Sequence, residues 1–307
     1  MKELEIINTI QNIINSEYIG DDCAYLKDLG IVVTQDSLVE DVHFSRKFST
    51  PYQIGYKSIA VNLSDIYASG AEAKYITISL SLPKNIENNF VEEFYNGAKS
   101  VLNGVKIVGG DITGADKIYI SVTAIGSTKN RKISSRKNAH IGYKIITNGY
   151  HGSSAAGLYL LQNKTEGYEQ LIKEHLTPFI SSELSDIIAK TTKNDYAMMD
   201  SSDGLMDCLY KIADNSKVKA KIYFDKIPYN KSIEQFDYKN LILYGGEDYK
   251  LVCAISADDL ENINSDLYYE IGEIIEKTDN NIVEIQYKNE LKSYSKKDIE
   301  VNLFRHF

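Results

Sequence analysis

Residues 51–82, PYQIGYKSIAVNLSDIYASGAEAKYITISLSL, hold the change from helix to strand that decides the fold. Between Ile59 and Ile66 the aliphatic side chains recur at helical spacing, and Gly70 is expected to end the helix. The apolar, β-branched run that begins at Tyr75 predicts a strand. A unit of this kind indicates a chain in which helices and strands alternate.

The same alternation extends along the rest of the chain. Further strands are predicted for the apolar runs that begin at Ile31, Val105, Ile118, Tyr143, Ala220 and Tyr249. Two more helical patterns begin at Phe90 and Leu205. The sequence therefore predicts an α/β or α+β protein.

Strand runs occur in both halves of the chain, and the polar, basic stretch 129–144 separates them. We expect a domain junction there, with the boundary near residue 140. The predicted domains are residues 1–140 and 141–307, and the second is expected to be α+β. The length of 307 residues is ample for two such units.

Composition excludes several classes of protein. There are 34 Lys and Arg against 43 Asp and Glu, a net charge of −9, whereas proteins that bind nucleic acid through phosphate contacts need a surplus of basic residues. The three Cys are far apart, which argues against a disulfide framework or a zinc site. No apolar run approaches the roughly 18 residues of a membrane helix, and the first residues lack a signal-peptide pattern. We therefore expect a cytoplasmic protein that binds neither nucleic acid nor membrane.

Acidic residues gather beside Gly or Ser at six places. These are residues 20–24 (GDDCA), 34–37 (TQDS) with the following His43, the helix position Asp65, 109–111 (GGD), 200–204 (DSSDG) and 245–249 (GGEDY). Glycine pairs let a backbone approach a polyphosphate, and carboxylates can hold the magnesium that accompanies it. Together the six clusters suggest a site that holds polyphosphate through several magnesium ions.

Each cluster alone also has an ordinary structural interpretation. Adjacent aspartates form solvated turns, and Asn62, Asp65 and Ser69 fit one solvated helix face. Gly109-Gly110 fits a hairpin turn, and Asp200 or Ser201 fits a helix N-cap. No P-loop, dinucleotide-binding, zinc-protease, serine-hydrolase or protein-kinase motif is present to favour one of those classes.

The ordered set of motifs resembles the thiamine-monophosphate kinases. The motifs are GDDCAYL, TQDSLVEDVHF, the segment from Pro51 to Ala71, IVGGDITGA, GSSAAGLYLL, MMDSSDGLMDCL and LYGGEDYKLV, and they span nearly the whole chain. That family belongs to an ATP-binding superfamily that also includes aminoimidazole ribonucleotide synthetase and selenophosphate synthetase. The resemblance implies ATP-dependent phosphorylation of thiamine monophosphate to thiamine diphosphate. It also implies a homodimer whose N-terminal sheets form a barrel, with an α+β second domain that closes the active site.

The resemblance also implies roles for individual residues. The positions that match magnesium ligands are Asp21 or Asp22, Thr34, Gln35, Asp36, Asp65, Asp111, Asp200 and Asp203. Those that match nucleotide contacts are Gly110, Asp111, Arg136 and Ser202, and those that match contacts to thiamine monophosphate are His43, Glu247 and Phe304. Three departures from the family pattern are Gln35 for a frequent Thr, Ser153 for a frequent Asp, and Gly114 for a frequent Arg.

The expected chemistry is direct in-line transfer of the γ-phosphate to the acceptor phosphate, so no catalytic nucleophile is predicted. The second pKa of a phosphate monoester is about 6, which makes a general base dispensable. Two alternatives stay open: another enzyme of the same superfamily with a different acceptor, and a non-catalytic protein that senses nucleotides or is stabilised by metal.

Overall fold

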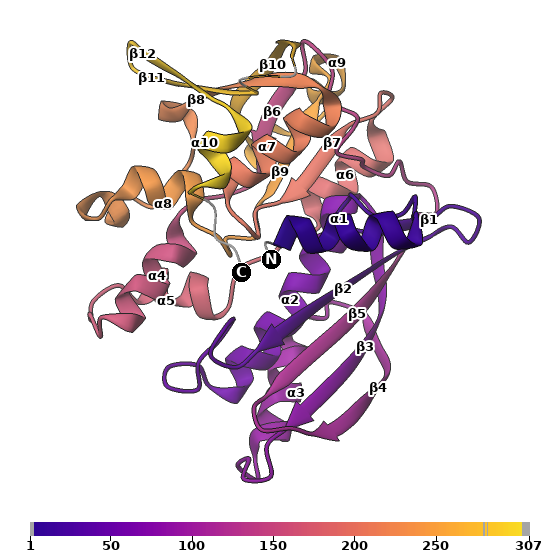
Figure 1. Cartoon of the computed structure of the whole chain (residues 1–307), viewed down its shortest axis with the longest axis vertical. Helices are drawn as coiled ribbons and strands as arrows, with labels where there is room; N and C mark the ends of the chain where they lie inside the picture. The colour runs from indigo at the N-terminus through magenta and orange to yellow at the C-terminus, as the bar shows by residue number, and fades with distance from the viewer. Residues whose placement is uncertain (1–2, 279, 281, 303–307) are drawn as a thin grey trace.

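A computed structural model describes residues 3–278, 280 and 282–302 of the chain. It contains two sheets with helices between and around them (Figure 1). The five-stranded sheet lies in the lower half of the view and the seven-stranded sheet in the upper half. This is a mixed α/β protein, as the alternation of helices and strands predicts.

The five-stranded sheet has the order β1-β2-β5-β3-β4 and is mostly antiparallel, with β3 and β4 parallel. Its strands and the helices of this part are α1 (Glu3–Ile14), β1 (Ala24–Leu26), β2 (Ile31–Val39), α2 (Pro51–Ser69), β3 (Glu72–Leu82), α3 (Phe90–Val101), β4 (Lys106–Gly114) and β5 (Tyr119–Ser127). Alternate side chains of β2, β3 and β5 are buried on the face that α2 covers. The residues between them are more exposed and form the opposite face of the sheet.

The seven-stranded sheet has the order β12-β11-β8-β10-β6-β9-β7. Its elements are β6 (Lys144–Thr147), α4 (Ser153–Gln162), α5 (Glu169–Leu176), α6 (Glu183–Thr191), β7 (Ala197–Asp200), α7 (Leu205–Ser216), β8 (Val218–Tyr223), α8 (Tyr238–Tyr244), β9 (Leu251–Ile255), α9 (Ala257–Leu260), β10 (Tyr269–Lys277), β11 (Val283–Tyr287), β12 (Glu290–Tyr294) and α10 (Lys296–Glu300). Three short 3-10 helices lie at Phe224–Lys226, Lys231–Gln235 and Ser265–Leu267.

Helix α2 lies between the two sheets. It packs against β2 and β5 on one side and against β7 and β9 on the other. Nearly every residue from Ile54 to Ser69 is therefore buried, as expected for a helix that is surrounded by protein. The helix begins at the N-cap Thr50, which accepts a hydrogen bond from the Gln53 amide, and ends at Gly70 in a left-handed conformation.

The second sheet is buried on both faces at β7 and β9. Met198, Leu251 and Cys253 join the core that surrounds α2, whereas Met199 and Val252 join a second core under α7. Strands covered on both faces are apolar throughout, without the alternation that marks a half-exposed strand. This arrangement fixes the carboxyl end of β7, at Asp200, beside α2.

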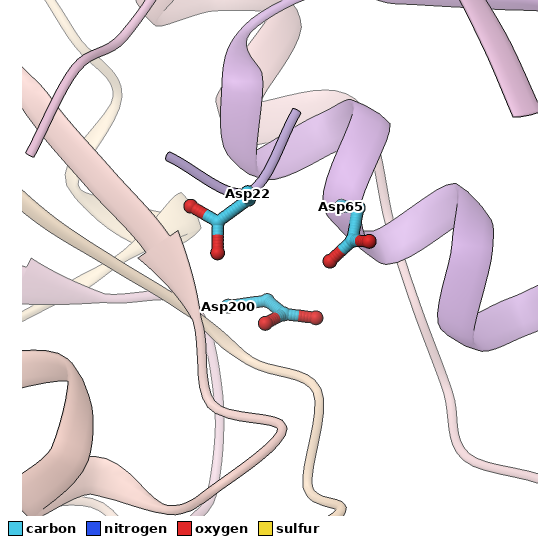
Figure 2. A group of neighbouring side chains, drawn as sticks. All are labelled: Asp22, Asp65 and Asp200. Atoms are coloured by element: carbon cyan, nitrogen blue, oxygen red, sulfur yellow. The ribbon is translucent and has the colours of Figure 1, made fainter. Parts of the chain in front are cut away.

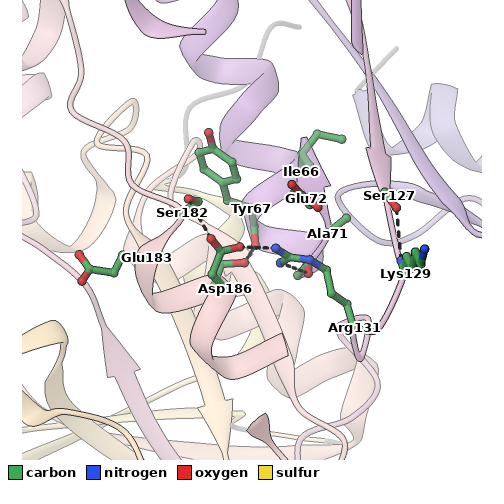
Figure 3. A network of polar contacts seen from close by, with 12 residues as sticks. Ile66, Tyr67, Ala71, Glu72, Ser127, Lys129, Arg131, Ser182, Glu183 and Asp186 are labelled. Atoms are coloured by element: carbon green, nitrogen blue, oxygen red, sulfur yellow. Dashed lines mark hydrogen bonds and ion pairs between the residues drawn. The ribbon is translucent and has the colours of Figure 1, made fainter. Parts of the chain in front are cut away.

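The basic stretch after β5 connects the two sheets. Arg131 donates from one guanidinium nitrogen to the Gly70 carbonyl (3.1 Å). From another it donates to the Asp186 carboxylate (2.6 Å), as Figure 3 shows. Its side chain is only 2% exposed. Arg131 therefore joins the end of α2 to α6, which lies beyond the junction.

Among the described residues, no helix has both the length and the apolar character that crossing a bilayer requires.

Candidate functional site

Three aspartates from separate parts of the chain meet beside α2. Asp22 comes from the turn before β1, Asp65 from α2 and Asp200 from the end of β7. One carboxylate oxygen of each lies within 4.8 Å of the others. Figure 2 shows the three carboxyl groups pointing toward a shared space. Oxygen ligands at this spacing suit a hard divalent cation.

Asp200 is the most deeply buried of the three, and neither of its carboxylate oxygens has a hydrogen-bond partner among the described residues. Burial and the nearby charge of Asp22 raise the pKa of Asp200 to about 7, although the Ser64 and Ser202 hydroxyls lie near enough to oppose the shift. Burial, Asp36 and Asp200 likewise raise the pKa of Asp65 well above its usual value. A buried carboxylate such as that of Asp200, without a hydrogen-bond partner among the described residues, is a donor that a bound cation would complete.

Two residues of β2 point toward the same space. The Thr34 hydroxyl donates to Asp65 Oδ2 (2.6 Å), and the Asp36 amide donates to Asn62 Oδ1 (3.0 Å). Burial, with the charges of Asp203 and Asp22, raises the pKa of Asp36 to about 6. Strand β2 therefore adds a fourth carboxylate and a hydroxyl to the group.

Gln35 lies on the other face of β2. Its side chain donates to the Ser121 hydroxyl (3.1 Å) and accepts from Thr123 Oγ1 (3.1 Å). The period of two along a strand separates it from Thr34 and Asp36. Its side chain therefore does not join Asp22, Asp36, Asp65 and Asp200, which together form the acidic group.

Two basic side chains border the acidic group. Arg136 donates from Nη2 to Asp22 Oδ1 (2.9 Å), and its amide donates to Asp21 Oδ1 (2.8 Å). Lys211 lies 3.2 Å from Asp203 Oδ2 and 2.6 Å from Asp207 Oδ2. Of these two neighbours, Asp22 is therefore the one that belongs to the acidic group. Asp21 accepts a hydrogen bond from the backbone of the segment that carries Arg136.

The loops that follow β7 and precede β9 are bonded to each other. The Glu247 amide donates to the Ser202 carbonyl (2.7 Å), and the Lys250 amide donates to the Ser201 hydroxyl (2.9 Å). The Asp248 carboxylate accepts from the Gly152 amide at the start of α4 (2.6 Å). These bonds place Glu247 and Ser202 side by side.

The side chain of Glu247 lies in a separate polar group. Its carboxylate is 2.8 Å from Lys57 Nζ and 3.4 Å from His175 Nδ1. Lys57 and His175 also line a small hollow together with His43. His43 accepts a hydrogen bond from the Val39 amide at Nδ1 (3.0 Å).

Two residues with predicted roles lie outside these groups. Gly110 and Asp111 are exposed on β4, the edge strand, and the chain does not bring them to the acidic group. Strand β4 runs through both glycines to Gly114, so the hairpin turn that we considered for Gly109-Gly110 is wrong. Phe304 lies outside the described residues.

Lys57, His175 and Lys211 did not follow from the sequence motifs. Only Lys57 could have been noticed in the sequence, because it is a lysine among the apolar residues of the predicted helix. The structure shows that this helix is buried on all sides. His175 and Lys211 occupy ordinary amphipathic helices, and only the fold shows that each contacts an acidic residue of a predicted cluster.

Comparison with known proteins identifies the family. Residues 20–128 match the family described as AIR synthase related protein, N-terminal domain. A thiamine-monophosphate kinase of Aquifex aeolicus is 36% identical over 264 residues, covering 81% of this chain and 84% of the relative. One from Bacillus subtilis is 32% identical over 288 residues, covering 86% and 87%.

A solved structure shares the complete fold. AaThiL complexed with AMPPCP and TMP superposes with a TM-score of 0.85 at 32% identity, over 100% of this chain and 97% of that one. Sequence identity and fold agree over nearly the whole length of the relatives. The chain therefore belongs to the thiamine-monophosphate kinase family.

Proposed function

We propose that this protein transfers the γ-phosphate of ATP to thiamine monophosphate, which gives thiamine diphosphate and ADP, with Mg²⁺ as the required cation. Family membership supports the reaction, since the related AaThiL is complexed with AMPPCP and TMP. The observation that carries the proposal is the group of Asp22, Asp65 and Asp200, because neither buried oxygen of Asp200 has a hydrogen-bond partner among the described residues.

The acidic residues are proposed as metal holders. Asp22, Asp65 and Asp200 would hold the cation, with Thr34, Asp36 and Asp203 beside them. Bound Mg²⁺ would offset the negative charge of the phosphate groups of both substrates. Without a cation, several converging carboxylates repel any phosphate that approaches.

The remaining site residues are proposed to bind and orient the two substrates. Arg136 supplies a positive charge beside Asp22, and Ser202 offers a hydroxyl in the next loop. His43 and Glu247 lie near Lys57 of α2, apart from the acidic group. They are proposed to orient the acceptor. In the transfer itself, a terminal oxygen of the acceptor phosphate bonds to the γ-phosphorus as the bond to the β–γ bridging oxygen breaks. No side chain has to act as nucleophile.

The proposal includes a homodimer in which the five-stranded sheets associate. The face of this sheet that α2 does not cover carries exposed Tyr75 and Tyr119, and edge strand β4 exposes Val108 and Ile112. Apolar side chains on an uncovered face and an unpaired strand edge favour association with a second copy. A closed barrel across two subunits and a domain boundary at residue 140 are parts of this proposal.

The deciding experiment is an assay of product formation from ATP and Mg²⁺ with thiamine monophosphate or thiamine as acceptor. We expect thiamine diphosphate from the first acceptor and no phosphorylation of the second. An absence of product from both would leave a superfamily relative with another acceptor, or a non-catalytic protein. Label that stays on the protein after incubation with ATP labelled at its γ-phosphate would contradict direct transfer.

A further inference from the structure

Lys57 is a buried ammonium group in the middle of the molecule. Its side chain is 4% exposed, and it projects from α2 at a position where the neighbours Ile54, Ser58 and Val61 are also buried. Burying an ammonium group is costly unless an anion and hydrogen bonds compensate. The packing of α2 needs no charge here, so the partner of Lys57 explains why a lysine occupies this position.

That partner is Glu247, the residue proposed to contact the acceptor. Lys57 Nζ lies 2.8 Å from Glu247 Oε1 and donates to the His43 carbonyl at 3.5 Å. Lys57 therefore touches both residues that are proposed to orient the acceptor: the carboxylate of Glu247 and the backbone of His43. A single side chain of α2 joins two segments that are about 200 residues apart in the sequence.

His175 completes the surroundings of the carboxylate. Its Nδ1 lies 3.4 Å from Glu247 Oε2 and 3.1 Å from the Ser154 hydroxyl. Burial and the charge of Lys57 lower the pKa of His175 to about 4, so its ring is neutral near pH 7. Burial alone would raise the pKa of Glu247, but the charge and hydrogen bond of Lys57, with His175 and His43, together lower the pKa below its usual value. Lys57 thus helps to keep a largely enclosed carboxylate ionised.

The backbone of Glu247 is fixed as firmly as its side chain. Its φ of 65° is left-handed, which is unfavourable for a residue with a side chain. The loop is held in this conformation by the bond that the Glu247 amide donates to the Ser202 carbonyl. The Asp248 carboxylate holds it as well, because it accepts hydrogen bonds from the Gly152 and Ser154 amides. The side chain is still 27% exposed, so part of the carboxylate can receive a further donor.

We infer that Lys57 and His175 are positioning residues for Glu247, and that they aim its carboxylate at a donor group on the ring system of the acceptor. The inference rests on the proposed function. Each carboxylate oxygen has two lone pairs, so contact with Lys57 and His175 leaves capacity for an amino group of the acceptor. Lys57 acts on acceptor binding through Glu247, and it takes no part in binding ATP.

The test compares steady-state kinetics of Lys57→Met with the unaltered protein. We expect the KM for thiamine monophosphate to rise about tenfold or more, because a partly buried carboxylate loses its charged partner. The KM for ATP should stay within about twofold. Lys57→Arg, which keeps the charge, should recover part of the loss. Lys74→Met is the matched control, because Lys74 pairs with Glu72 on the surface and should change neither constant.

A double substitution separates this role from a general structural one. Glu247→Gln should raise the KM for thiamine monophosphate, and adding Lys57→Met to it should cause little further change, because the two residues act as one unit. If Lys57→Met leaves that KM unchanged, or if its effect persists in the Glu247→Gln background, the inference is wrong. Circular dichroism checks that each variant folds. If Lys57→Met does not fold, the same KM is measured for Lys57→Arg and for the double variant, in which the pair of residues 57 and 247 is neutral.

Failure of the inference and failure of the proposed function give different results. A protein that does not phosphorylate thiamine monophosphate at all contradicts the function before any variant is made. An active protein in which Glu247→Gln raises the KM but Lys57→Met does not contradicts the positioning role alone.

Discussion

At the scale of single residues, the Asp200 carboxylate shows most directly what the site requires. It is 1% exposed, faces Asp22 and Asp65, and neither oxygen has a hydrogen-bond partner among the described residues. Such a group destabilises the folded chain unless it is protonated or meets a cation. The proposed cation site therefore lowers the stability of the metal-free protein.

Replacing a member of this group should abolish activity and preserve the fold. We expect Asp200→Asn or Asp65→Asn to lower turnover at least about 100-fold, since loss of even an outer-shell partner of a metal ligand costs about 10–100-fold. Thermal unfolding without metal should be unchanged or occur at higher temperature, because a like charge has been removed. Asp258→Asn, at an exposed site, is the control. Turnover near that of the unaltered protein at saturating Mg²⁺ would contradict the assignment.

The raised pKa values predict how stability and metal binding depend on pH. Asp36 and Asp200 have pKa values of about 6 and about 7, above the unfolded value near 4, so the folded chain holds more protons between about pH 4 and 7. Their contribution to stability is present at low pH and is lost as pH rises through these values. Since Mg²⁺ must displace the same protons, its affinity should fall as pH drops below about 7.

Thermal unfolding between about pH 5 and 8 measures both effects. In the presence of a chelator, the melting temperature of the unaltered protein should fall with rising pH more steeply than that of Asp200→Asn, which lacks one of the titrating groups. Added Mg²⁺ should raise the melting temperature more at about pH 8 than at about pH 6. Equal slopes for the two proteins would contradict the prediction.

At the scale of elements, α2 depends on close contact with α3. The Cβ of an alanine at position 55 would lie 1.9 Å from the Phe94 carbonyl oxygen, and one at position 97 would lie 1.9 Å from that of Tyr52. The two helices therefore approach at a pair of glycines, and no larger side chain fits without moving a backbone. Helix α2 carries both Asp65 of the acidic group and Lys57, the partner of Glu247. This crossing therefore sets the positions of both residues.

Gly55→Ala should destabilise the protein by ~1–3 kcal/mol, the usual cost of overpacking a core, although alanine favours a helix by up to ~1 kcal/mol. Urea unfolding measures the change in the free energy of unfolding. Gly114→Ala is the control, because a Cβ there meets no atom within 4 Å. If Gly55→Ala proves as stable as Gly114→Ala, the close approach of the two helices does not constrain α2.

The sequence predicted several of the elements that have one exposed face. Strands β2 and β5 alternate buried and more exposed residues, and α3 has an apolar stripe on one face. Such patterns can be recognised in the sequence. Strand β7 was missed because it has only four residues, all of them buried and without alternation, whereas β9, which is also fully buried, belongs to a longer apolar run. The conformation of Gly109-Gly110 was also open, since a glycine pair fits a turn and an exposed edge strand equally well.

At the scale of the whole molecule, the sequence indicated candidate residues for the site but not how they are distributed in space. Motifs pointed to Asp21 or Asp22, Asp65 and Asp200, and the fold brings Asp22 together with the other two. No pattern could show that α2 lies between two sheets, because that position depends on long-range packing. Lys57 and His175 became visible only once α2, α5 and the loop before β9 were placed beside one another.

The position of Asp111 has a consequence for assembly. Strand β4 is separated from β2 by β5 and β3, and at ~4.8 Å between neighbouring strands Asp111 lies about 14 Å from Asp36. Asp111 pairs with Ser79 of β3, and Ser79 pairs with Ser121 of β5. Ser121 in turn pairs with Ser37 of β2, whose side chain lies on the face opposite to that of Asp36. If Asp111 contacts the nucleotide, as the family resemblance implies, it reaches the acidic group of a second copy and not its own.

Mixing two inactive variants tests this arrangement. Asp111→Asn and Asp200→Asn should each be inactive alone. In a symmetric dimer with sites shared between subunits, random exchange of an equal mixture makes half of the dimers mixed, and each mixed dimer regains one intact site of two. Activity should therefore recover to about a quarter of that of the unaltered protein, and analytical ultracentrifugation should show a dimer. No recovery after confirmed subunit exchange would mean that each chain supplies its own Asp111, and a monomer with full activity would contradict the assembly itself.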